Sequence, residues 1–219
     1  MPLRRWMVVL WSAAALLNAL TLGMVFGYAP VEVQMGAVQK IFYYHVPSAI
    51  VCYVLLFLAA LFSALYLWKE EAVYDTVAHA MAEVGWIFIT IVLVTGPIWG
   101  RSAWGKWWVW EPRLTSFLVL WLMYSAYFLL RLFSAGETRT AKIAAVVAIV
   151  AFFDVPIVHK AISWWGSIVH PRKVTLEAPM RQTFFVAMVA VFVLASAMVI
   201  TRLAVGLAEA RRGSEGAAS

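Results

Sequence analysis

The chain has one cysteine among 219 residues, and only 13% of its residues are charged. A single cysteine excludes an internal disulfide and an internal CxxC redox pair. So little charge, together with 64% hydrophobic residues, excludes an ordinary water-soluble domain, in which about 25% of residues are charged. The net charge of +6 lies at the ends of apolar runs, where cations meet lipid headgroups, so we expect a lipid bilayer and no nucleic acid as partner.

The apolar residues fall in blocks of about twenty, the length that a helix needs to cross a bilayer. We therefore predict an all-α, polytopic membrane protein with six transmembrane helices, as a single domain over 1–219 with a frayed tail at 206–219. An even number of spans places both termini on one side, and Arg4 and Arg5 favour the cytoplasm for that side. The predicted spans are 6–27, 42–68, 77–99, 114–133, 141–158 and 183–205.

Tryptophan is concentrated on the predicted outer side, which holds seven of the twelve. An interfacial belt would divide them between both membrane surfaces. Gly96 and Pro97 are expected to end the third span and to begin a Trp-rich outer loop before the fourth, within 99–115. Clustered indoles form a rigid apolar surface that suits a planar aromatic ligand, and a Trp-rich segment resting in the interface is the alternative. The cluster comprises Trp104, Trp107, Trp108 and Trp110.

Polar residues surround this cluster. Glu111 and Pro112 suit the start of the fourth span, since proline is tolerated in a first turn and an acid is favourable at a helix N-terminus. Arg113 carries a forked donor that can bind a carboxylate or reach lipid headgroups. Further outer cations that could meet an anionic ligand are Arg101, Lys106 and Arg172.

Three of the four histidines, His45, His159 and His170, lie on the predicted outer side, whereas His79 lies on the inner side. His45 precedes Pro47 closely, which predicts an extended approach to the second span. Two histidines that converge over the indoles could bind a haem iron, with nearby cations on the propionates. Zinc is less suitable, because the chain has no HExxH motif and no cysteine ligand set. The spacing alone leaves open which histidines converge.

The sequence resembles the CcmC family, the haem-handling proteins of cytochrome c maturation. The segment Trp104-Gly-Lys-Trp-Trp-Val-Trp-Glu-Pro-Arg-Leu-Thr115 is similar to the family's WGxWWxWDxRLT signature, called the WWD domain. Tyr44-His-Val-Pro-Ser-Ala49 is similar to the family's LHVPxA, and Pro156-Ile-Val-His-Lys-Ala-Ile-Ser-Trp-Trp165 is followed by His170 as in the family. These motifs occur in the family's order, and the six-span layout covers nearly the whole chain.

The resemblance implies that haem b is held transiently on the outer, periplasmic side of a bacterial inner membrane. It implies His45 and His170 as axial ligands, and Trp104 to Trp110 as the platform. The haem would pass to the periplasmic haem chaperone CcmE, with the small subunit CcmD and the CcmAB transporter as further partners. The protein would present haem and would have no catalytic residue of its own, with a haem lyase activity toward the chaperone as an enzymatic role left open.

Two departures from the family pattern affect these expectations. The family usually has Asp where this chain has Glu111, and the stretch from Trp165 to His170 is one residue longer than usual. His159 is therefore the reserve second ligand. Two other functions stay open: a permease or scaffold subunit of a transporter complex that binds no haem, and a minimal haem lyase that acts directly on apocytochrome c.

Overall fold

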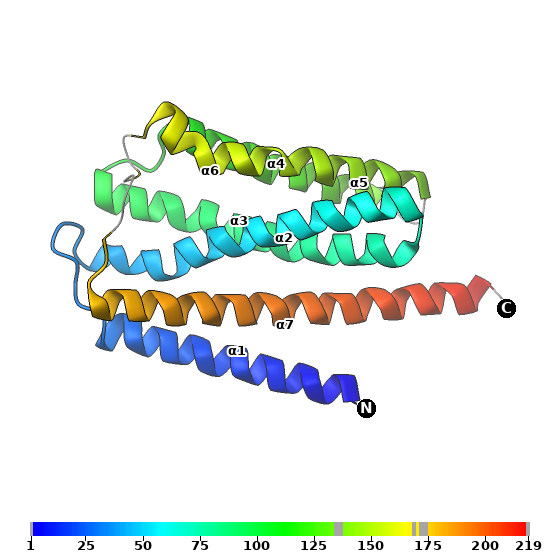
Figure 1. Cartoon of the computed structure of the whole chain (residues 1–219), viewed down its shortest axis with the longest axis horizontal. Coiled ribbons are helices and arrows are strands. Elements are labelled where there is room, and N and C mark those ends of the chain that lie inside the picture. Colours follow the sequence, from blue (N-terminus) through cyan, green and yellow to red (C-terminus); the bar gives the residue numbers. More distant parts are fainter. Residues whose placement is uncertain (1, 134–137, 168–169, 171–174, 218–219) are drawn as a thin grey trace.

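The structure is a computed structural model that describes residues 2–133, 138–167, 170 and 175–217. In this part of the chain the regular elements are helical, and Figure 1 shows them as a bundle of long, nearly parallel rods. The elements are α1 (Pro2–Gly27), the 3-10 helix η1 (Ala37–Ile41), α2 (Phe42–Lys69), α3 (Ala72–Trp104), α4 (Pro112–Phe133), α5 (Thr138–Phe152), α6 (Asp154–Trp165) and α7 (Ala178–Ala217).

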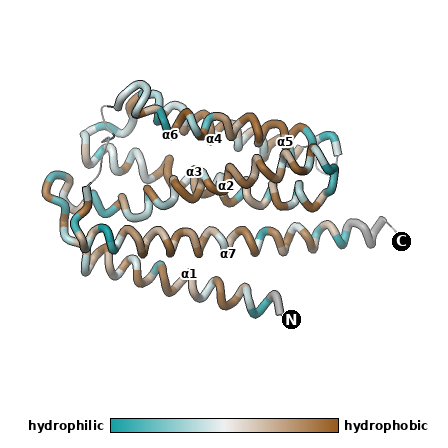
Figure 2. The backbone as a smooth tube through the Cα atoms, in the orientation of Figure 1, coloured by the Kyte–Doolittle hydropathy of each residue, from teal (hydrophilic) through white to brown (hydrophobic). Residues whose placement is uncertain are grey.

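Six segments of the described chain are long and apolar enough to span a membrane, with α5 and α6 counting together as one. Figure 2 shows the hydrophobic residues along the middle of the helices, and hydrophilic residues gathered toward both ends of the bundle. The prediction of an all-α membrane protein with six spanning helices is therefore confirmed.

The two ends of the bundle carry different parts of the chain. Both chain ends lie at one end, whereas η1 and the Trp-containing connection 105–111 lie at the other (Figure 1). We call the end with 105–111 the site end, and the opposite one the terminal end. Helices α2 and α3 pack along each other, α4 packs on α5 and α6, and α1 packs on α7.

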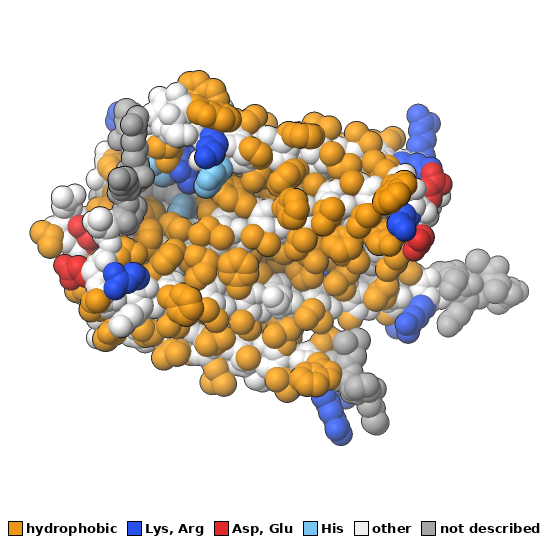
Figure 3. All heavy atoms as spheres, viewed as in Figure 1, with side chains coloured by type: hydrophobic (Ala, Val, Ile, Leu, Met, Phe, Trp, Pro, Cys, Tyr) orange, Lys and Arg blue, Asp and Glu red, His pale blue; other side chains and the backbone are white. Residues whose placement is uncertain are grey.

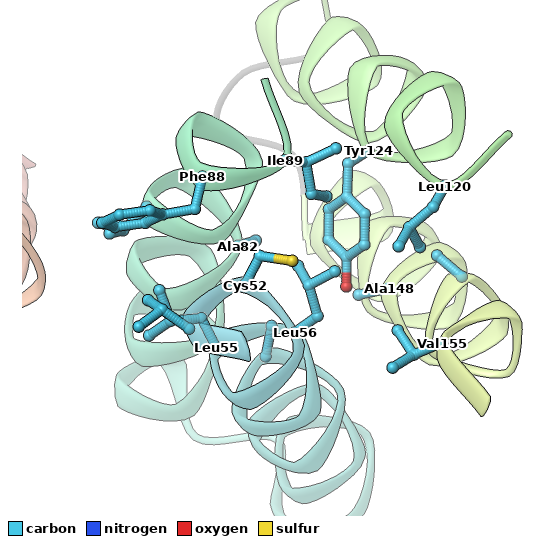
Figure 4. Packing of buried hydrophobic residues seen from close by; sticks show 14 of the residues in the cluster. Cys52, Leu55, Leu56, Ala82, Phe88, Ile89, Leu120, Tyr124, Ala148 and Val155 are labelled. Carbon is cyan, nitrogen blue, oxygen red and sulfur yellow. The ribbon is translucent and has the colours of Figure 1, made fainter. Parts of the chain in front are cut away.

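The main core lies where α2, α3, α4 and α5 meet. Figure 4 shows Cys52, Ile89 and Tyr124 converging there from three different helices. Gly85 brings α3 close to α2, because a Cβ atom at this position would lie 2.8 Å from Leu56 Cδ2. The small residue lets these two adjacent spans pack closely along their length.

Charged residues join the helices at the terminal end. Arg131 of α4 donates two hydrogen bonds of 2.7 Å to the two carboxylate oxygens of Asp75 on α3. Arg202 of α7 donates from Nε to Glu83 Oε2 on α3 at 2.5 Å. Because ionic groups are costly inside a bilayer unless they are paired, these contacts fix α4 and α7 against α3 at a defined register.

Three sequence-based expectations about helix boundaries are wrong. Pro97 lies inside α3, which continues to Trp104, since membrane helices tolerate proline where neighbouring groups compensate for its missing N–H. His45 and Pro47 lie within α2, so the approach to this span is helical. The fifth span breaks at Phe153, where the ring of Pro156 is incompatible with a continuous helix.

The last helix is the longest of the described elements. α7 continues through Ala217, and the fraying that we expect from 206 onward stays a prediction. The residues in this stretch include Ala, Leu, Glu and Arg, which are strong helix formers. An ion pair of 3.6 Å between Arg202 and Glu209 adds support across two turns of the helix.

Candidate functional site

His45 lies in the first turns of α2 at the site end and is half-buried. Its Nδ1 atom lies 2.8 Å from Thr95 Oγ1 on α3. The Thr95 hydroxyl also bonds the Ile91 carbonyl oxygen, at 2.7 Å. His45 is thus held between two adjacent spans, and its Nε2 atom makes no hydrogen bond with any described residue.

His170 lies in the connection between α6 and α7, and Glu111 holds it. The His170 Nδ1–H group donates to Glu111 Oε1 at 2.8 Å. The Ser167 hydroxyl donates to Glu111 Oε2 at 2.7 Å and accepts the backbone N–H of His170 at 2.8 Å. Glu111 is only 7% exposed, so this carboxylate is a buried anchor for the histidine. Glu111 therefore orients His170, in addition to the role at the start of α4 that its sequence position indicates.

Two stacked indoles connect the two histidines. The Trp99 ring lies edge-on to His45 with the ring centroids 5.5 Å apart. Trp99 stacks on Trp104 at 6.2 Å, and Trp104 lies 6.2 Å from the His170 ring. His170 also lies within electrostatic range of His45. The two histidines that the resemblance proposes as a pair are therefore brought to one region, from opposite ends of an aromatic row.

The other predicted platform residues form a second group. Trp108 packs edge-on against Trp110 with centroids 5.7 Å apart, and Trp107 and Trp110 are exposed. The Trp108 Nε1 atom is buried without a hydrogen-bond partner in the described chain, and the same holds for Trp99 Nε1. Indole N–H groups that are buried normally find an acceptor. The two groups are donors available to a ligand that brings acceptors of its own.

The predicted cations have different positions. Arg113 is half-buried, lies within electrostatic range of both His45 and His170, and makes no ion pair with any described residue. Arg101 donates to the Gly105 carbonyl at 2.8 Å, next to the end of α3, and Lys106 is exposed. Arg172 lies outside the described residues. Figure 3 shows histidine and Lys or Arg side chains gathered in a recess beside α6 at the site end.

The protonation of His170 is set by its surroundings. Burial lowers the pKa of His170 and the nearby Arg113 guanidinium lowers it further, while the hydrogen bond and charge of Glu111 oppose both. A lowered pKa keeps the imidazole neutral at pH 7. Since Glu111 occupies Nδ1, the lone pair of the neutral ring lies on Nε2, as a metal ligand requires.

The remaining histidines lie apart from this arrangement. His159 is exposed on α6, and no hydrogen bond, ion pair or ring contact among the described residues joins it to His45 or His170. His79 lies near the terminal end, with Nδ1 3.3 Å from the Tyr127 hydroxyl. The geometry therefore favours the pair of His45 and His170 over one that includes the reserve residue.

The residues that the sequence did not single out are Thr95, Trp99 and Ser167. Thr95 and Ser167 each orient a histidine or its carboxylate, and Trp99 joins the aromatic row. Trp99 could have been found from its place five residues before Trp104, if the sequence had predicted that α3 continues to Trp104. Thr95 and Ser167 could not have been found from the sequence, because single hydroxyl residues are common in membrane helices and in loops.

The donor set decides what the site can bind. Within the described part of the chain no three His, Cys, Asp or Glu residues gather to hold a metal ion. Two imidazoles fall short of the four ligands of a structural zinc site, but they suit a haem iron, whose other four ligands come from the porphyrin. The fold and the site together define a multi-pass helical membrane protein with two histidines and a row of indole rings at one end.

Comparison with known proteins agrees with this class. The family model described as "Heme exporter protein C", CcmC, matches residues 2–217. The chain is 36% identical over 165 residues to heme exporter protein C of Escherichia coli K12, covering 72% of this chain and 65% of that protein. It is 30% identical over 200 residues to heme exporter protein C of Paracoccus denitrificans, covering 88% of this chain and 83% of the relative. The chain belongs to the heme exporter protein C family.

Proposed function

We propose that the protein binds haem b transiently at the periplasmic face of a bacterial inner membrane and passes it to the haem chaperone CcmE. Its matched region spans 65% of the length of the Escherichia coli relative, so the activity and partners of that whole protein are part of this proposal. CcmD and the CcmAB transporter are the further partners that we propose, and we assign the termini to the cytoplasm.

The observation that supports the proposal is a hydrogen-bonding pattern that the two histidines share. Both His45 and His170 engage Nδ1 with a neighbouring oxygen, and neither engages Nε2 within the described residues. Metal-binding histidines typically use one ring nitrogen for the metal and donate the other N–H to an oxygen. Bound haem would supply an iron with two axial positions, and these two rings would hold it.

The surroundings suit the rest of a haem. Trp99 and Trp104 offer flat apolar surfaces for the macrocycle, and each of them contacts one of the two imidazoles. Arg113, which has no ion-pair partner in the described chain, is the cation that we assign to a propionate carboxylate. Arg101 and Lys106 are more exposed, so we assign them a weaker part in propionate binding.

The absorption spectrum of the purified protein reconstituted with haem tests this function. We expect a Soret band typical of bis-histidine haem, reduced or shifted in His45→Ala and in His170→Ala. His79→Ala and His159→Ala are the matched controls and should leave the spectrum unchanged. If no Soret band forms after reconstitution, the haem function is excluded and a scaffold role is supported. Transfer to purified CcmE, compared with transfer to apocytochrome c, separates a haem presenter from a direct lyase.

A further inference from the structure

In the hydrogen bond between His45 and Thr95, the neighbouring contacts identify which residue donates and which accepts. The Thr95 hydroxyl has one proton, and it lies 2.7 Å from the Ile91 carbonyl oxygen, which can only accept a hydrogen bond. Because the hydroxyl donates its proton in a hydrogen bond to that carbonyl, Thr95 Oγ1 is an acceptor toward His45 Nδ1, 2.8 Å away. The imidazole then carries its proton on Nδ1 and its lone pair on Nε2.

Two other hydroxyls in this chain also bond a carbonyl of their own helix and contact a ring nitrogen, and there the ring is an indole, which can only donate. The Thr90 hydroxyl bonds the Trp86 carbonyl four residues earlier at 2.9 Å and accepts Trp121 Nε1–H at 3.0 Å. Ser125 likewise bonds the Trp121 carbonyl at 2.8 Å and accepts Trp86 Nε1–H at 3.1 Å. An indole N–H has no acceptor role, so the direction of these bonds is fixed. Thr95 has the same pair of contacts, with an imidazole in place of the indole.

We propose that Thr95 is a positioning residue that fixes the tautomer and the orientation of His45, so that Nε2 is presented as a ligand. The importance of Nε2 for haem rests on the proposed function, whereas the tautomer itself does not. A hydroxyl suits this position inside α3, because a carboxylate such as the one behind His170 would be costly within a spanning helix. The back-bond to Ile91 gives the hydroxyl the acceptor character that a carboxylate would supply.

His79 provides an internal comparison with the opposite expectation. Its Nδ1 atom lies 3.3 Å from the Tyr127 hydroxyl, whose oxygen accepts an N–H group of Arg131 at 3.3 Å. The Tyr127 proton is therefore available to His79 Nδ1, and the other ring nitrogen lies 3.8 Å from the Glu83 carboxylate. We expect His79 to carry its proton on Nε2, next to that negative charge.

Nitrogen NMR of the haem-free protein in detergent micelles tests the tautomer directly. With 15N-labelled histidine, His45 should show a protonated Nδ1 and an unprotonated Nε2, and His79 should show the reverse. Thr95→Val, which keeps the shape and removes the acceptor, should shift His45 toward the Nε2–H form, whereas Thr95→Ser should preserve the Nδ1–H form. An Nε2–H form of His45 in the unmodified protein would overturn the proposal, and so would a tautomer that Thr95→Val leaves unchanged.

Haem titration of the same variants tests the consequence. Thr95→Val should bind haem 10- to 100-fold more weakly, the usual cost of losing an outer-shell partner, and Thr95→Ser should bind within a few-fold of the parent protein. Thr90→Val is the control, since it removes a similar hydroxyl from the same helix away from His45. Equal affinity in Thr95→Val and the parent would overturn the positioning role. If the parent binds no haem while the tautomers are as expected, the haem function fails and the positioning role stands.

Discussion

Glu111 offers the sharpest test of the site, because its carboxylate is buried and holds His170 through a 2.8 Å bond. A hydrogen bond to a charged group is worth about 1.5–3 kcal/mol, and one between neutral groups about 0.5–1.5 kcal/mol. Glu111→Gln keeps the side-chain shape and exchanges the first for the second, a loss of about 1–2 kcal/mol. At 1.4 kcal/mol for each factor of ten, haem binding should weaken roughly 5- to 30-fold.

The measurement is a haem titration followed by Soret absorbance in detergent micelles. Glu111→Asp keeps the charge and introduces the acid of the WWD signature that this segment resembles, so it should lose less affinity than Glu111→Gln. The decisive comparison is made in a His170→Ala background, where Glu111→Gln should have almost no further effect, because the carboxylate acts through that ring. An equal loss of affinity with and without His170 would refute the reasoning.

Three further predictions concern charge and packing. Arg113→Gln should raise the pKa of His170, because the guanidinium is one of the groups that lower it; an NMR pH titration of the haem-free protein would show the midpoint moving upward, and a downward shift would contradict this. Asp75→Asn should lower the free energy of unfolding by about 2–3 kcal/mol, since it leaves Arg131 without its charge partner, and denaturant unfolding that is unchanged would argue against it. Gly85→Ala should destabilise by about 1–3 kcal/mol through overpacking against Leu56 of α2, and the loss should be smaller when it is measured in a Leu56→Ala background.

The helices could be predicted from the sequence because bilayer thickness and hydropathy determine where they lie. Their boundaries were less predictable where proline intervenes. Pro97 does not end α3, whereas Pro156 lies next to a real break at Phe153. The two prolines look alike in the sequence, and only the packing around each decides between a continued helix and a break.

The site could be predicted in its main residues and only partly in its arrangement. His45 and His170 were named from motifs, but their spacing along the chain carries no information about which histidines converge. That information arises because α2 and α3 pack together while Glu111, at the start of α4, reaches the connection before α7. Trp99 was left out of the predicted platform because the motif that defines the platform begins at Trp104, whereas the structure stacks the two rings on each other.

The pairing of α1 with α7 has a consequence for how the protein is made. Helix α1 leaves the ribosome before α7 and packs on it, through contacts such as Trp11 with Thr201 and Tyr28 with Gln182. Until α7 has been synthesised, the Asn18 amide of α1 lacks its hydrogen bond to that helix. The bundle therefore closes only after translation of the C-terminal helix, and a chain truncated before α7 would leave α1 without its main support.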